Sequence, residues 1–154
     1  MMIDYNEEEP HYLLDSNIVS EIIKRDADFN VLKQLAAHNS DCAISSPTLH
    51  ELLYGYHKVS DGLYKTYLGN YIIDDVQETF KVKSYTEKAC EIHARIRADA
   101  ERNGKPVPFS DSMIAAIALA NHMVLVTRNT KHFTAIQEVS DLQVENWFEE
   151  ASPA

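Results

Sequence analysis

Short apolar segments with strand character alternate with longer helical segments along most of this chain. The strand-like segments cover residues 12–15, 42–45, 78–82, 123–127 and a closing stretch within 142–147. Helical patterns are predicted over residues 17–24, 27–38, 47–59, 61–71, 85–102 and 110–121. Strands separated by helices predict a parallel sheet with helices on both of its faces. The sequence therefore indicates an α/β fold.

Length and composition favour one domain over residues 11–150, preceded by a flexible acidic leader at residues 1–10. The chain has 154 residues, of which 45% are apolar, as is usual for a globular domain. No apolar stretch approaches the roughly 18 residues of a membrane span. The first residues lack the basic and apolar regions of a signal peptide. Because Cys42 and Cys90 are isolated, we expect reduced thiols in a cytoplasmic protein.

The net charge of −10 is unevenly distributed along the chain. Residues 1–10 contain four acidic residues and residues 138–154 contain five, with no Lys or Arg in either segment. Residues 11–137 therefore carry a net charge of only −1. A nearly neutral body can hold local basic patches, so a nucleic-acid partner remains compatible with the sequence.

Asp15 ends the first predicted strand, in the stretch "YLLDSNIVSEI". Ligands of parallel α/β sheets bind where the strands end, which makes Asp15 a candidate for chemistry. It could instead only cap the following helix, although Ser16 or Asn17 could cap that helix unaided.

Two further acidic residues have informative surroundings. Glu51 lies opposite the apolar face of its helix, as an ordinary surface glutamate would, but Gly55 follows one turn later on the same face. A helical glycine can mark close approach by another group. Asp111 lies in the first turn of its helix, where an acid complements the helix dipole. Ala115 and Ala118 share its face and would let the helix pack tightly against the sheet.

The three acids would need a counter-ion if they converge, because like charges at close range repel one another and destabilise the charged carboxylates. Oxygen ligands without Cys or His favour Mg²⁺ or Mn²⁺ over zinc. Such an ion activates water and stabilises charge on a phosphoryl group, so convergence predicts metal-assisted phosphodiester hydrolysis. Thr127 and Asn129 follow another strand and could complete a polar pocket or merely belong to a loop.

Three segments together resemble the PIN-domain ribonucleases, particularly the VapC-type toxins of bacterial toxin–antitoxin pairs. They are "YLLDSNIVSEI", "ISSPTLHELLYGY" and "KPVPFSDSMIAAIALANHMVLVTRNTKHF". They occur in the family's order and spacing, and the similarity runs over residues 11–148. The resemblance implies a three-layer α/β/α sandwich with a central parallel sheet.

The resemblance also implies roles for individual residues. Asp15, Glu51 and Asp111 would form the acidic metal site, with Asn17 supporting Asp15 by hydrogen bonding. Ser16 replaces the commoner Thr and keeps the hydroxyl. Asn129 stands where many members have a fourth catalytic acid, which puts a second metal ion in doubt.

The implied activity is metal-dependent cleavage of RNA with one Mg²⁺ or Mn²⁺. The implied partners are the RNA substrate, a cognate antitoxin that blocks the site, and a second copy of the chain in a homodimer. No membrane association is implied.

Other polar and aromatic residues leave alternatives open. Arg102, Lys105 and Arg128 are candidates for steering phosphates, because flanking loops could bring them near the acids. His132 matches a family feature, but a structural role is favoured over a catalytic one. Five tyrosines could stack on RNA bases, although their helical spacing favours packing in the core or in a dimer: Tyr54, Tyr56, Tyr64, Tyr67 and Tyr71.

Three other functions fit the sequence less well than a nuclease does. A dinucleotide-binding enzyme needs a glycine-rich turn after the first strand, and "DSNIVS" contains no glycine. An aspartyl-phosphate phosphatase would resemble a DxD pattern, but Asn17 occupies the second acidic position. A non-catalytic binding module with the same fold, its site damaged at Asn129, is the more serious alternative.

Overall fold

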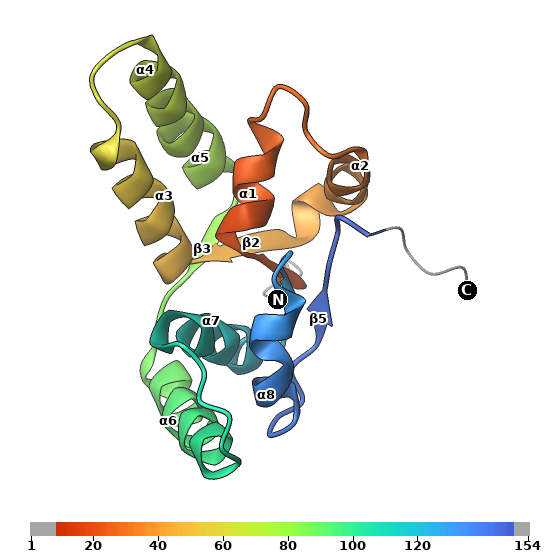
Figure 1. Cartoon of the computed structure of the whole chain (residues 1–154). Coiled ribbons are helices and arrows are strands. Elements are labelled where there is room, and N and C mark those ends of the chain that lie inside the picture. The colour runs from red at the N-terminus through yellow and green to blue at the C-terminus, as the bar shows by residue number, and fades with distance from the viewer. Residues whose placement is uncertain (1–8, 150–154) are drawn as a thin grey trace, which may run out of the picture.

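The computed structural model describes residues 9–149. They contain one five-stranded sheet with helices packed around it (Figure 1). The strand order is β3-β2-β1-β4-β5, and every neighbouring pair is parallel. The strands are β1 (Tyr12–Leu14), β2 (Cys42–Ser45), β3 (Lys81–Lys83), β4 (Val124–Val126) and β5 (Val144–Glu145). Most of the predicted leader, residues 1–8, and residue 150 of the predicted domain lie outside the described residues.

Helices cover both faces of the sheet and give the predicted α/β/α sandwich (Figure 1). On one face pack α1 (Ser16–Ile22), α2 (Phe29–His38), α3 (Ser46–Lys58), α4 (Leu63–Asn70) and the π-helix η2 (Tyr71–Val76). On the other pack α6 (Glu87–Arg102), α7 (Phe109–Ala120), the short 3-10 helix η3 (Thr130–Phe133) and α8 (Thr134–Gln137). None of the helices within residues 9–149 is long and apolar enough to cross a membrane.

Successive strand residues divide the apolar core into two halves. Leu13 packs with α6, α7 and α8, whereas the next residue, Leu14, packs with α1, α2 and α3. Leu125 and Val126 of β4 divide in the same way. This follows from the strand geometry, in which neighbouring side chains point to opposite faces of the sheet. Because both faces are buried, these strands are apolar at every position.

The structure corrects two parts of the secondary-structure prediction. The strand predicted at residues 78–82 begins later: Gln77–Thr79 is a helical turn, α5, and the strand is Lys81–Lys83, so only Lys81 and Val82 of the predicted segment belong to it. Phe80 is buried between them, which produced the misleading alternation. The prediction also missed η3 and α8, which are too short to show a helical period.

A candidate active site at the carboxyl end of the sheet

Asp15 lies at the carboxyl end of β1, the central strand, and begins α1. Its Oδ1 accepts a hydrogen bond from the Ser16 backbone N–H at 2.8 Å, and its Oδ2 accepts one from Thr127 Oγ1 at 2.9 Å. Asp15 is thus the capping residue of α1, which is one of the two roles that the sequence left open for it. Only 7% of Asp15 is exposed. Its carboxylate is held by residues that follow two different strands, Ser16 after β1 and Thr127 after β4.

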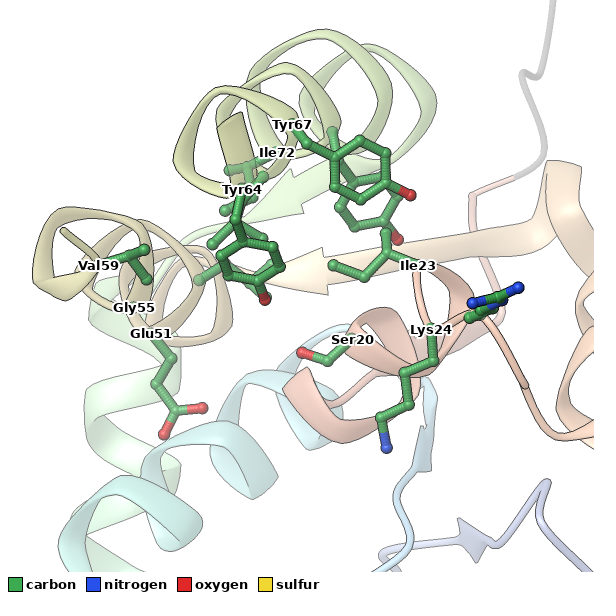
Figure 2. Close-up of a pocket in the computed structure, with 13 residues that line it drawn as sticks. Ser20, Ile23, Lys24, Glu51, Gly55, Val59, Tyr64, Tyr67 and Ile72 are labelled. Carbon is green, nitrogen blue, oxygen red and sulfur yellow. The ribbon is translucent and has the colours of Figure 1, made fainter. Parts of the chain in front are cut away.

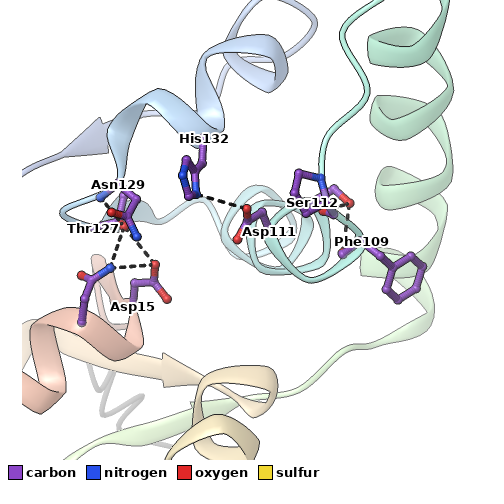
Figure 3. A network of polar contacts seen from close by, with 9 residues as sticks. Asp15, Phe109, Asp111, Ser112, Thr127, Asn129 and His132 are labelled. Atoms are coloured by element: carbon purple, nitrogen blue, oxygen red, sulfur yellow. Dashed lines mark hydrogen bonds and ion pairs between the residues drawn. The ribbon is translucent and has the colours of Figure 1, made fainter.

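Asn17 and Thr127 hold the ends of β1 and β4 together around this carboxylate. Figure 3 shows Thr127 beside Asp15. Asn17 Nδ2 donates to Asp15 Oδ2 at 3.4 Å and to Thr127 Oγ1 at 3.3 Å. Asn17 Oδ1 accepts from the backbone N–H of Arg128 at 3.1 Å. The backbone N–H of Asn129 donates to Thr127 Oγ1 at 3.1 Å, while the Asn129 side chain is exposed.

Asp111 projects from the first turn of α7 toward the same edge of the sheet (Figure 3). Ala115 and Ala118, one and two turns further on, are fully buried, so this helix packs closely on the sheet. Asp111 Oδ2 lies 3.4 Å from His132 Nδ1 of η3. His132, which the sequence favoured as structural, therefore contacts one of the candidate acids. No periodic pattern marked it, because η3 spans only one turn.

Glu51 lies on the exposed side of α3, and its charge acts on both other acids. Burial raises the pKa of Asp15, the bonds from Ser16 and Thr127 lower it, and the charges of Glu51 and Asp111 raise it further. Burial raises the pKa of Asp111, His132 lowers it, and Glu51 raises it. The three acids therefore share one electrostatic environment, called the acid site below: the charge of Glu51 disfavours the charged forms of Asp15 and Asp111, and the charge of Asp111 disfavours that of Asp15.

The donor chemistry of the acid site suits a hard divalent cation. Carboxylate oxygens are the ligands that Mg²⁺ and Mn²⁺ prefer, and a cation would relieve the mutual repulsion of Asp15, Glu51 and Asp111. Within residues 9–149, however, no three acidic, His or Cys side chains lie close enough to enclose a metal ion. The residues fit such an ion by type and charge.

The three cationic candidates from the sequence lie in different surroundings. Arg102 pairs with Asp99 on its own helix, and Lys105 Nζ lies 2.9 Å from Glu138 Oε2, beyond α8. The Arg128 guanidinium lies 4.4 Å from the centre of the Phe148 ring. The backbone of Arg128 therefore lies beside Asn17. Arg102 and Lys105 instead form ion pairs with Asp99 and Glu138, which are not among the three candidate acids.

Comparison with known proteins identifies the family. The family model of the PIN domain matches residues 12–139. The chain belongs to the PIN-domain family. A PIN-domain relative in Shigella flexneri, the tRNA(fMet)-specific endonuclease VapC, is 32% identical over 136 residues, which are 88% of this chain and 97% of the relative. Toxin FitB of Neisseria gonorrhoeae is 29% identical over 126 residues, 80% of this chain and 91% of that protein.

Solved PIN-domain structures share the fold over nearly the whole length. FitAcB from Neisseria gonorrhoeae aligns with a TM-score of 0.82 at 27% identity, covering 90% of this chain and 99% of that chain.

Behind Asp111, the buried His93 joins α6 to α7 of this PIN domain. His93 Nε2 lies 2.7 Å from Ser112 Oγ, and His93 Nδ1 lies 2.7 Å from Tyr85 Oη. Ser112 Oγ donates to the Phe109 carbonyl at 3.0 Å, so we assign Nε2–H as the donor to Ser112 and Nδ1 as the acceptor from Tyr85. The neutral imidazole satisfies every bond in this chain of contacts.

We expect thermal stability to fall as pH is lowered from about 7.5 to 5.5, partly through His93. Burial lowers the pKa of His93, and the Arg97 charge lowers it further. Below the ordinary histidine pKa of about 6.5, His93 therefore binds a proton in the unfolded chain but stays neutral in the folded chain. This difference favours unfolding. Asp15 and Asp111, with raised pKa values, act in the opposite direction at lower pH.

The measurement is the melting temperature across this pH range. His93→Gln should show a shallower decline, whereas the exposed control His122→Gln should follow the wild type. Parallel profiles for wild type and His93→Gln would contradict the assignment.

Proposed function

We propose that this PIN-domain protein is a metal-dependent endoribonuclease and the toxin of a toxin–antitoxin pair, acting in the cytoplasm. The observation that carries the proposal is that the charge of Glu51 acts on both Asp15 and Asp111 at the carboxyl end of the sheet. The name of the Shigella flexneri relative, a tRNA-specific endonuclease, supports RNA as the substrate. All three principal acids are present, which favours catalysis over a binding module with a damaged site.

The chain's own residues would orient the reacting groups. Thr127 and Asn17 hold the Asp15 carboxylate in one orientation, and close packing of α7 fixes Asp111 opposite it. Together with Glu51 these carboxylates would hold one Mg²⁺ or Mn²⁺ ion. When bound, this ion supplies an activated water and stabilises charge on the scissile phosphate. His132, beside Asp111, would keep that carboxylate turned toward the site.

The proposed partners are a cognate antitoxin and a second copy of the chain. Relatives and solved neighbours named as the toxin FitB and as FitAcB support the antitoxin. A basic antitoxin side chain would be attracted to the acid site by charge-assisted hydrogen bonding. Exposed Leu63 and Ile73 on α4 and η2 are candidate homodimer contacts.

Metal-dependent cleavage tests the nuclease proposal. Purified, antitoxin-free protein should cut a pool of structured cellular RNAs when supplied with Mg²⁺ or Mn²⁺, and a chelator should abolish the cutting. Restoring each ion separately to the chelated sample should recover the activity and rank the two metals. Cleavage that persists in the chelator would reject the metal requirement, and a folded, metal-supplied protein that cuts nothing would support the binding module instead.

A further inference from the structure

We propose that the cavity between α1, α3 and α4 binds one unpaired base of the RNA substrate, beside the scissile phosphate. This inference deepens the proposed function and rests on it. The cavity has a volume of about 550 Å³, within the range of small-molecule sites. Figure 2 shows Tyr64 and Tyr67 of α4 on one wall, with Ser20 of α1 and Glu51 of α3 across from them.

The position of the cavity ties it to the acid site. Glu51 lines the cavity, and the charge of the same carboxylate acts on Asp15 and Asp111. A base in the cavity would therefore belong to a nucleotide close to the scissile phosphate, which the cation bound by the three acids would hold. Because Glu51 belongs to both, the cavity and the acid site are adjacent.

The tyrosines of α4 are available for stacking. Tyr64 is 60% exposed and Tyr67 is 55% exposed, so neither packs in the core, whereas packing in a dimer, the other expectation for them, stays a prediction. Tyr71, by contrast, donates a hydrogen bond to the Val19 carbonyl at 2.8 Å and is held in place. Single-stranded RNA is commonly bound by unstacked bases lying on such exposed aromatic rings.

The charge around the cavity matches a nucleotide rather than a free apolar group. Lys24 and Arg25 line the cavity at the end of α1. Lys24 Nζ lies 2.8 Å from Glu21, whereas Arg25 forms no ion pair with any residue in the range 9–149. These cations offset the negative charge of Glu51 and would attract the phosphates flanking a bound base.

Gly55 keeps the cavity open. Gly55 lines the cavity, and a Cβ atom there would meet nothing within 4 Å, so the first atom of a side chain at this position would lie in open space. The expectation that Gly55 marks close approach by another group is therefore wrong. Gly69 is the contrasting case, because its Cβ would lie 2.9 Å from Tyr56 Cε2. Glycine is disfavoured within helices, so each of these two glycines needs a reason. At Gly69 the reason is close packing against Tyr56. At Gly55 we infer that the reason is the space left for a ligand.

Binding of short RNA to the full chain tests the proposal. The probes are fluorescein-labelled single-stranded homopolymers of A, C and U, about eight nucleotides long, and an abasic oligonucleotide of equal length. All proteins carry Asp15→Asn, so that binding is measured by anisotropy without cleavage. Into this background we place Tyr64→Leu, Gly55→Leu to fill the cavity, and Tyr54→Leu as the control. Tyr54 is a similarly exposed tyrosine, 57%, outside the cavity lining.

We expect Tyr64→Leu and Gly55→Leu each to weaken binding of at least one homopolymer about tenfold, as for loss of one stacked base. Neither should alter binding of the abasic oligonucleotide, and Tyr54→Leu should alter neither. Unchanged homopolymer affinity in variants whose melting temperatures match the parent would overturn the proposal. So would equal weakening of homopolymer and abasic binding, or a loss confined to binding of a co-expressed antitoxin. RNA cleavage by the wild-type chain is scored separately, so failure of the nuclease proposal is recognised independently.

Discussion

Asp15→Asn is expected to reduce RNA cleavage by about a thousandfold. Charge stabilisation by a bound metal ion amounts to several kcal/mol, and about 4 kcal/mol corresponds to three decades in rate. The neutral amide would weaken the hold on the cation at the centre of the acid site. The measurement is the single-turnover rate on an RNA that the wild type cuts, with the exposed Asp26→Asn as the matched control.

The same substitution should leave the fold as stable as before, or more so, near pH 7. Asparagine is as good a helix cap as aspartate, and Asp15 is buried near two other acids that disfavour its charge. Loss of activity with an unchanged or raised melting temperature would mark Asp15 as a residue maintained for chemistry. Loss of activity together with unfolding would remove the support for a catalytic role, and full activity would reject the assignment.

Phe133→Ala is expected to destabilise the protein by about 3–5 kcal/mol, as for other buried phenylalanines. The Phe133 ring is fully buried in the core half that contains α6, α7 and α8. It also anchors η3, the turn that carries His132. Deleting it would leave a cavity beneath the acid site and lower both stability and activity.

Urea denaturation of Phe133→Ala and of the matched control Phe29→Ala measures this effect. Phe29 is 75% exposed, and its truncation should change the free energy of unfolding by less than about 0.5 kcal/mol. A similar small change for Phe133→Ala would mean that η3 is not anchored as described.

The fold could be predicted because its strands are buried on both faces. The central strands are continuously apolar and alternate with helical periods, and these two patterns together favour a parallel sheet. Asp15 stood out for the same reason, since an acid directly after a buried strand has few ordinary roles. The edge strand β3 was misplaced because its burial is slight: Lys81 and Val82 are exposed, and an exposed strand shows no core-facing pattern.

The remaining site residues depend on long-range geometry that local patterns do not encode. Glu51 has the position of an ordinary surface residue, and only the arrangement of α3 beside α7 makes it a neighbour of Asp111. The direction of the loop at residues 103–108 sends Lys105 to Glu138, contrary to the expectation that it would approach the acids. His132 contacts Asp111 across more than twenty residues of sequence. The cavity at Gly55 was likewise invisible, because an empty space leaves no periodic signal.

The division of the core by successive strand residues has a consequence for how this chain can change in length. Inserting or deleting one residue within Tyr12–Leu14 would exchange the environments of Leu13 and Leu14 and rotate the chain entering Asp15 toward the wrong face of the sheet. Both halves of the core and the acid site would be lost in one step. The exposed turn at residues 103–105 carries no such coupling, so length variation, peptide tags and engineered insertions belong there.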